Sequence, residues 1–162
     1  MASVSNNRIS LHWFRKGLRL HDNPALVAAC RAGTCYPVFV MDPWYAKPDI
    51  IGINRYSFVL ESMKDLDDSL RQLGSRLYVF RGKPEIEIPK YIQEWKVNYL
   101  TFEVDTDGYS RIRDTKLIET VNAMGGVEVE TFTSHTIFSY SDYMKALNGK
   151  PAPVSYGSFG KL

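Results

Sequence analysis

The sequence predicts an α/β fold: a Rossmann-like open sheet of five parallel strands with helices on both faces. Short apolar runs alternate with helical patterns from residue 8 to residue 132, the order that right-handed strand–helix–strand crossovers require. The composition, with 44% hydrophobic and 23% charged residues in a chain of 162, is that of a folded protein with one core. We expect the strand order 3-2-1-4-5 within a domain that spans residues 1–133.

The first two strands and the helix between them have clear signals. Residues 8–14 (RISLHWF) are typical of a strand, and residues 24–32 of a helix. Asn23 is the predicted N-cap of that helix, with Pro24 at its first position. Residues 36–42 (YPVFVMD) form a continuous apolar run, as expected for a buried parallel strand.

The later elements continue the alternation. In the long helix after the second strand, apolar residues keep a helical spacing until Gly74 ends it. Gly82 and Pro84 mark the turn after the third strand. Residues 133–162, rich in Ser, Tyr, Pro and Gly, are expected to form an irregular segment that leaves the domain. The predicted elements are a helix over 54–73, a strand over 76–80, a helix over 84–95, a strand over 98–104, a helix over 110–123 and a strand over 126–132.

Charge and cysteine content narrow the cellular setting. The net charge of +2 is too small to indicate nucleic-acid binding by itself. Cys30 and Cys35 lack a CxxC spacing, so we expect two small buried side chains rather than a disulfide, which favours a reducing compartment. The N-terminus has no signal-type apolar stretch, and no apolar run approaches the ~20 residues of a membrane span. We therefore expect neither secretion nor a membrane.

Charged and aromatic side chains gather where the predicted strands end. The carboxyl ends of parallel strands meet at one edge of the sheet, which is where α/β proteins bind ligands. The alternative is that these residues are polar only because loops are solvated. The candidates are Arg15, Lys16 and Arg19 after the first strand, Asp42 and Trp44 after the second, Arg81 and Lys83 after the third, and Glu103, Asp105, Asp107 and Tyr109 after the fourth.

Sequence motifs for catalysis and metal binding are missing. The chain has no GxGxxG fingerprint, no P-loop and no GxSxG elbow. Its three histidines, His12, His21 and His135, lie far apart, without a metal-ligand spacing. Since His12 lies inside a strand, we expect a core side chain there. We predict no catalytic residue and no metal site.

The stretch WFRKGLRLHDNPAL at residues 13–26 resembles the first signature of the photolyase and cryptochrome family, W-F-R-x-x-L-R-x-x-D-N-P-A-L. The residues of this motif are more similar to those of animal cryptochromes and six-four photolyases than to those of the bacterial branch. One departure is Asp107-Gly108-Tyr109, where the family commonly has Glu-Pro-Tyr, and glycine there predicts a looser loop. Later matches to family landmarks are residues 37–44, 53–84, 104–114 and 134–139.

The resemblance implies the N-terminal α/β domain of a blue-light photoreceptor or DNA photolyase, with residues 134–162 as the start of an interdomain connector. In complete relatives, a helical domain holds FAD for light signalling or for repair of DNA lesions by deoxyribodipyrimidine or six-four photolyases. The chain stops at Leu162, so we expect that domain and its FAD site to be absent. The isolated chain is accordingly predicted to be catalytically inactive and to reach DNA only through the missing domain.

The resemblance also suggests what the α/β domain itself binds. In some relatives it holds an antenna deazaflavin, folate or flavin mononucleotide. In many animal cryptochromes it holds none and serves as a surface for partners, which implies clock or signalling proteins and a location in nucleus and cytoplasm. Two alternatives remain open: a stand-alone, non-catalytic protein-interaction module derived from the family, and a small nucleotide-binding protein of the wider α/β class.

An antenna chromophore is expected over the strand ends. Arg55 is included because Asn54 and Arg55 match the family's Asn-Arg pair at the start of the long helix. The alternative for Phe39 and Met41 is that they are ordinary core residues of a strand. The alternative for the arginines after the first strand is that they pair with a nearby acid, which for Arg19 is Asp22. The expected frame is Arg15, Lys16, Phe39, Met41, Asp42, Arg55, Asp105 and Asp107.

The tail carries the last prediction. Without a helical domain to cover them, its aromatic residues are expected to be exposed and to drive homodimerisation or exchange of the tail between chains. The alternative is that the tail folds back over its own domain. The residues concerned are Tyr140, Tyr143, Tyr156 and Phe159.

Overall fold

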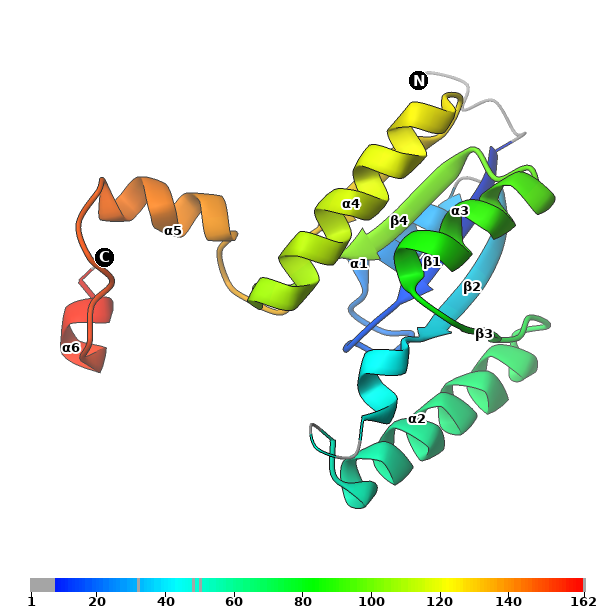
Figure 1. Cartoon of the computed structure of the whole chain (residues 1–162), viewed down its shortest axis with the longest axis horizontal. Helices are drawn as coiled ribbons and strands as arrows, with labels where there is room; N and C mark the ends of the chain where they lie inside the picture. Colours follow the sequence, from blue (N-terminus) through cyan, green and yellow to red (C-terminus); the bar gives the residue numbers. More distant parts are fainter. Residues whose placement is uncertain (1–7, 32, 48, 50, 162) are drawn as a thin grey trace.

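The computed structural model describes residues 8–31, 33–47, 49 and 51–161. At its centre is a five-stranded parallel sheet in the order β3-β2-β1-β4-β5 (Figure 1), which confirms the predicted fold class and strand order. β1 is the central strand and pairs with β2 on one side and with β4 on the other. The strands are β1 (Arg8–Phe14), β2 (Gly33–Met41), β3 (Tyr78–Arg81), β4 (Tyr99–Glu103) and β5 (Glu128–Phe132).

Helices cover both faces of the sheet, as predicted. Successive side chains of a strand point to opposite faces. Accordingly, Trp13 belongs to an apolar cluster that includes residues of α3 and α4, whereas Phe14 belongs to a second cluster with residues of α1 and α2. The helices are α1 (Pro24–Arg31), the short 3-10 helix η1 (Pro43–Ala46), α2 (Ile53–Gln72), α3 (Pro84–Glu94), α4 (Gly108–Met124), α5 (Tyr140–Leu147) and α6 (Tyr156–Phe159).

The first corner of the fold forms as its sequence predicts. The Asn23 side chain is buried and accepts a hydrogen bond from the Leu26 amide at 2.9 Å, which confirms the N-cap. His12 is also fully buried, with its Nδ1 3.0 Å from the Thr101 hydroxyl of β4. Burial lowers the pKa of His12 to about 3, so the ring is neutral at pH 7. The prediction of a core histidine is confirmed.

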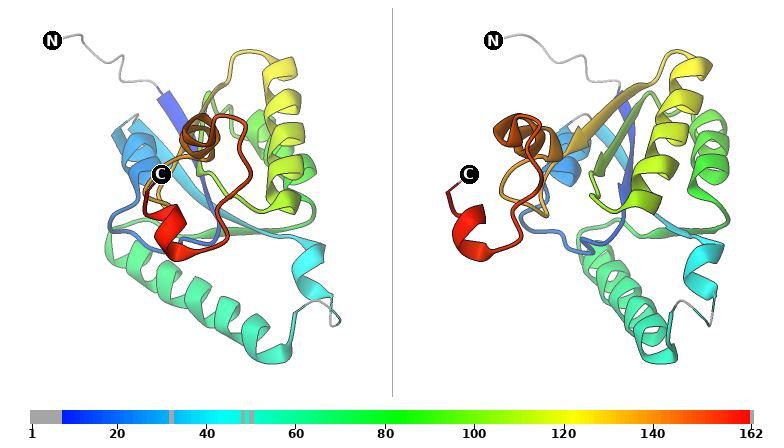
Figure 2. Two further views of the ribbon diagram at one scale, coloured as in Figure 1. Left: turned by 90° about the vertical axis from the view of Figure 1, so that its left-hand side faces the viewer. Right: turned by 60° about the vertical axis from the view of Figure 1, so that its left-hand side comes forward.

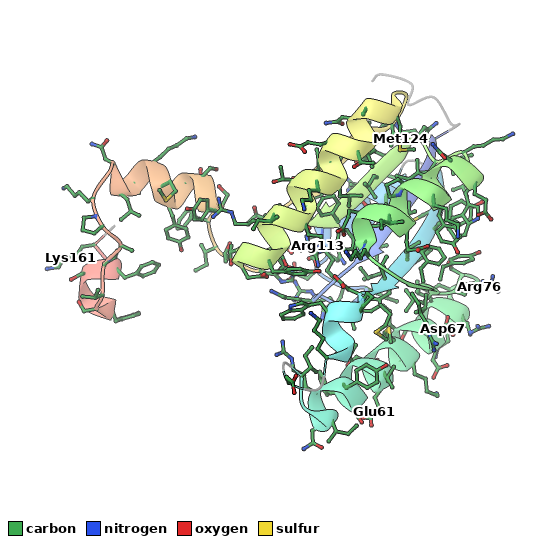
Figure 3. All side chains as sticks on the ribbon, in the orientation of Figure 1. Glu61, Asp67, Arg76, Arg113, Met124 and Lys161 are labelled. Atoms are coloured by element: carbon green, nitrogen blue, oxygen red, sulfur yellow. The ribbon has the colours of Figure 1, made fainter. Side chains whose placement is uncertain are left out.

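Helix α2 extends well beyond the sheet. Of its twenty residues, only Met63, Leu66 and Leu70, in its C-terminal two-thirds, are buried. Phe58, one of the helically spaced apolar residues of this helix, is 69% exposed. Figure 1 and Figure 2 show the N-terminal end of the helix standing away from the strands. The helix ends as expected at Gly74, whose φ of 77° lies in the left-handed region.

The C-terminal segment differs from its prediction. Residues 133–162 were expected to be irregular, yet α5 and α6 are helical. A capping box begins α5: Ser139 and Asp142 each bond the other's backbone amide. The expectation of an irregular segment rested on a composition rich in Ser, Tyr and Gly and did not take account of this capping box. The two helices lie to one side of the sheet (Figure 1), so within the described chain the tail does not fold back over the domain core.

The cysteines depart from expectation in one respect. Both are free thiols, as predicted, but Cys30 is exposed and Cys35 half-buried, so the prediction that both are buried is wrong. Cys30 lies in the last turn of α1, on the side that faces solvent. Among the described residues, no helix is both long and apolar enough to cross a membrane.

Candidate functional site

A cavity of about 420 Å³ opens beyond the carboxyl ends of β1 and β2. One wall is the loop that follows β1, residues 15–19. The opposite wall is the N-terminal half of α2, which contributes four side chains, and Phe39 of β2 forms the floor. The helix can supply this wall because it extends past the sheet. We call this space the crest cavity.

The crest cavity combines an apolar interior with a cationic rim. Phe39 is 6% exposed and packs in the core beneath the cavity, while Phe58 and Val59 face it from α2. Arg55 and Lys16 are exposed at the edge. The volume lies within the range of about 300–1,000 Å³ common for small-molecule sites, and a flat aromatic ligand with an anionic or carbonyl edge suits this lining.

Arg15 is the most constrained cation at the crest. Its guanidinium lies 2.8 Å from Asp105 and 2.6 Å from Asp114, and it donates to the Glu103 carbonyl at 2.9 Å. The side chain is 3% exposed and also lies over the ring of Trp13. These contacts join the exits of β1 and β4 to α4. The alternative reading of Arg15, pairing with loop acids, is therefore what the structure shows.

One donor of Arg15 nevertheless has no partner among the described atoms. Among the described atoms, the Nε groups of Arg15 and Arg19 are buried and have no hydrogen-bond partner. Both residues line the crest cavity. Arg19 otherwise bonds the carbonyl of Asp22 at 2.9 Å, with the Asp22 carboxylate 3.6 Å away, as its alternative reading proposed. A buried donor without a partner is unfavourable, so an acceptor in the cavity would stabilise both side chains.

Lys16 is held by two carboxylates. Its Nζ lies 2.8 Å from Asp107 and 3.1 Å from Asp105. Burial opposes the charge on Lys16, yet the hydrogen bonds to Asp107 and Asp105 outweigh it and raise the pKa. Burial likewise opposes the charge on Asp107, but hydrogen bonds from Lys16 and Ser110 hold the pKa of that carboxyl well below its usual range. Both groups stay charged across the physiological range.

Asp42 has a structural role beside the cavity. One oxygen accepts from the Trp44 amide at 2.9 Å and caps η1, and the other accepts from the Tyr109 hydroxyl at 2.5 Å. The rings of Trp44 and Tyr109 stack at 5.2 Å. This arrangement ties the exit of β2 to the first turn of α4. The expected loosening of the loop at Gly108 is opposed here, because Asp107 caps α4 through the Ser110 amide.

Gly17 allows the β1 loop to pass close to the end of β4. A Cβ atom at this position would lie 2.5 Å from an oxygen of Glu103, so no other residue fits without movement. Glu103 is held in turn by the hydroxyl of Ser134 and by His135, whose Nε2 is 3.4 Å away. The loop that forms one wall of the crest cavity is therefore fixed by contact with β4 and the segment after β5.

The residues of the predicted frame have three different places in the structure. Arg15, Lys16, Phe39 and Arg55 line the crest cavity, whereas Met41 packs in the core with α2. The three acids, Asp42, Asp105 and Asp107, serve as partners of the loop cations and of Tyr109. Sequence reasoning missed Gly17, Leu18, Phe58, Val59 and Ser62 as lining residues. The spacing of Arg55, Phe58, Val59 and Ser62 at three and four positions was a usable signal, since it places them on one face of α2.

Comparison with known proteins decides the family. The family model described as DNA photolyase matches residues 10–161. The chain belongs to the DNA photolyase family. It is 46% identical over 151 residues to Cryptochrome-2 of Gallus gallus, which covers 93% of this chain and 26% of the relative. It is also 46% identical over 172 alignment positions to the (6-4)DNA photolyase of Arabidopsis thaliana, covering 100% of this chain and 31% of that protein.

Solved structures agree on the fold. An archaeal photolyase from Sulfolobus tokodaii superposes with a TM-score of 0.68 at 26% identity over 89% of this chain and 35% of its own. That protein was solved with two FAD molecules, with the implication of a novel light-harvesting cofactor. A cryptochrome from Synechocystis superposes with a TM-score of 0.75 over 93% of this chain and 35% of its own, at 23% identity, and shows the shared fold. The chain thus spans about a quarter to a third of these relatives and corresponds to their N-terminal α/β domain.

Proposed function

We propose that this chain is the N-terminal module of a FAD-dependent blue-light photoreceptor or DNA photolyase, and that its crest cavity binds a flat antenna chromophore. The observation that carries the proposal is the crest cavity itself, with an apolar interior between Phe39 and Phe58 and two buried guanidinium Nε groups without partners. The relevant ligand class is a deazaflavin, a folate or a flavin. FAD of the photochemical reaction, and contacts with DNA, belong to the helical domain of the complete protein.

The residues of the cavity suit such a ligand in distinct ways. Phe39 and Phe58 offer aromatic surfaces for ring contact. The Nε groups of Arg15 and Arg19 are aligned by their ion pairs and can donate to a carbonyl or anionic edge. Arg55, exposed on α2, can close over the ligand from the opposite wall. When bound, the chromophore would supply light absorption and energy transfer.

Titration of the chain with a 5-deazaflavin, a folate and flavin mononucleotide, followed by fluorescence anisotropy, tests this proposal. At least one of them should bind with one-to-one stoichiometry. Arg55→Ala should weaken that binding about tenfold, the loss of one charge-assisted hydrogen bond. Arg71→Ala is the matched control, because Arg71 lies on the same helix but outside the cavity and pairs with Asp67. Equal affinity for the Arg55→Ala and Arg71→Ala variants would contradict the assignment.

A second function is favoured by the exposed end of α2. Ile53 and Phe58 are 75% and 69% exposed next to the mouth of the cavity. Exposed apolar side chains beside a groove are typical of protein interaction sites. In this reading the module binds clock or signalling proteins in the nucleus and cytoplasm, whether within a complete protein or as a stand-alone unit. Ile53→Ser should then abolish capture of such a partner while chromophore titration remains unchanged.

A further inference from the structure

The two cysteines meet at the edge of the sheet opposite the crest. Cys30 lies in the last turn of α1, and Cys35 lies near the start of β2. Each thiol is the largest influence on the pKa of the other. Both line a second cavity, of about 570 Å³, whose other walls are mainly apolar residues of α1, β2 and the end of α2. The chain therefore places two thiols in contact at the rim of an apolar hollow.

Ser10 holds the backbone on both sides of this contact. Its buried hydroxyl lies 3.0 Å from the Ala29 carbonyl and 3.0 Å from the Thr34 carbonyl. These carbonyls belong to the residues immediately before Cys30 and Cys35. A single oxygen thus fixes the two segments relative to each other, and the close meeting of the thiols is set by the core rather than by the surface. The register of β1 with β2, which pairs Ser10 with Cys35, maintains the same arrangement.

The two thiols have different chemical environments. Cys30 is exposed, and the hydrogen bond from Cys35, opposed by partial burial, lowers the pKa of Cys30 to about 7. Cys35 is half-buried, and its hydrogen bond to Cys30, together with burial, raises the pKa of Cys35 far above its usual range. The lowered pKa favours the Cys30 thiolate, the reactive form of a cysteine, at neutral pH. Cys35 stays a protonated thiol beside it.

We propose that Cys30 and Cys35 form a peroxide-sensitive dithiol site, in which exposed Cys30 is the attacking thiol and shielded Cys35 resolves it as a disulfide. Attack of the Cys30 thiolate on a hydroperoxide forms an S–O bond and breaks the O–O bond, and the departing hydroxide or alkoxide takes a proton from water. Cys35 sulfur then attacks the sulfenic sulfur of Cys30. The S–S bond forms, and the thiol proton leaves with the hydroxyl group as water. The two thiols lose two electrons, which reduce the peroxide.

The site is separate from the crest cavity. Cys35 is the third residue of β2, whereas Phe39 and the crest lie at the other end of that strand. The disulfide would close a loop of only a few residues, so it should stabilise the domain less than a disulfide that closes a long loop. What it changes is the surface of the apolar hollow, where two thiols become one disulfide. Formation and reduction are thus expected without loss of the fold or of chromophore binding.

Peptide mapping after treatment of the whole chain with hydrogen peroxide tests the proposal. Trypsin cleaves after Arg31, between the two cysteines, so an internal disulfide keeps two peptides joined until dithiothreitol is added. We expect this joined pair in the oxidised chain, with no covalent dimer. In Cys35→Ala, Cys30 should stop at a sulfenic acid that dimedone labels. In Cys30→Ser, Cys35 should stay reduced at the same peroxide dose.

A second measurement does not depend on peroxide. The rate of Cys30 alkylation by iodoacetamide should rise with pH to half of its maximum near pH 7, and this midpoint should move upward in Cys35→Ala, where the hydrogen-bond donor is gone. The proposal is overturned if the midpoint is the same in both proteins. It is equally overturned if Cys35 oxidises at an unchanged rate in Cys30→Ser, or if peroxide takes Cys30 to a sulfinic acid without a disulfide.

Discussion

The guanidinium of Arg15 lies 2.6 Å from the carboxylate of Asp114, and the two side chains are 3% and 11% exposed. Ninety-nine positions separate these residues, so the ion pair joins the exit of β1 to α4 across the middle of the sheet. Removing one partner of a buried pair leaves an uncompensated charge. We therefore expect the stability of the whole domain to depend strongly on this ion pair.

Asp114→Asn should lower the free energy of unfolding by about 3 kcal/mol, as measured by urea denaturation, because Arg15 loses a buried counter-charge. Asp68→Asn is the matched control, since Asp68 pairs with Lys64 on the exposed side of α2. That variant should unfold at nearly the wild-type urea concentration. Comparable losses in the two variants would show that Arg15 does not depend on Asp114.

Gly108→Pro should stabilise the chain by about 0.4–1 kcal/mol, because a proline reduces the freedom of the unfolded chain. Gly108 is the first residue of α4, where proline is favoured, and the preceding Asp107 has the extended conformation that proline requires, with φ −72° and ψ 150°. An added Cβ atom would meet nothing within 4 Å. Thermal unfolding measures the effect. Gly74→Pro, at a φ of 77°, should instead destabilise, and the same sign for both variants would refute the reasoning.

The free energy of unfolding should decrease as the pH is lowered, because the unfolded chain takes up a proton on His12 that the folded chain does not. Burial lowers the pKa of His12 to about 3, against 6.5 without burial. Above pH 6.5 the ring is neutral in both states, so it contributes no pH dependence there. As pH falls from 6.5 towards 3, only the unfolded chain takes up the proton, and folding loses about 2 kcal/mol between pH 7 and pH 5.

Urea denaturation as a function of pH measures this loss. His12→Gln should be less stable at pH 7 but should lack the slope between pH 7 and pH 5. His21→Gln should keep the wild-type slope, because His21 is exposed. An unchanged slope in His12→Gln would mean that other groups carry the pH dependence.

The chain should dimerise or exchange its tail between copies at roughly tens of micromolar, the range of weak interfaces. Val154 and Tyr156 are fully or almost fully exposed, and Phe159 and Tyr143 form a small aromatic cluster that the rest of the described chain does not cover. Analytical ultracentrifugation over a concentration series should show a dimer that Tyr156→Ser weakens. Leu73→Ser, which removes an exposed apolar residue from the end of α2, should leave the equilibrium unchanged. A strictly monomeric wild-type chain would refute the prediction.

Local signals were sufficient for most of the fold. The helix cap at Asn23 and the stop at Gly74 depend on a few neighbouring residues, and alternation with right-handed crossovers narrows the strand order. The tail shows the limit of composition: Ser139 with Asp142 is a readable capping box, but the surrounding Ser, Tyr and Gly favoured an irregular segment.

The candidate site was less predictable because it depends on distant contacts. Helical spacing places Phe58 on an apolar stripe, but it does not reveal that α2 extends past the sheet and leaves this ring at a cavity. The charge pattern placed Arg15 at the crest, yet its partner Asp114 comes from a helix whose packing no local rule gives. The sequence places the acids after the ends of the strands, but only the structure shows that they pair with the cations.

Strand order 3-2-1-4-5 has its topological switch point between β1 and β4, where crossovers leave the sheet in opposite directions and ligands of open α/β sheets commonly sit. In this chain Arg15 occupies that crevice: it follows β1, bonds the carbonyl of Glu103 at the end of β4 and pairs with Asp105 just beyond. A side chain of the protein thus fills the usual binding place of such sheets, and the crest cavity lies to one side of it, over β1 and β2. Replacing Arg15 and its acidic partners with residues that have shorter side chains would open a second cleft between the ends of β1 and β4.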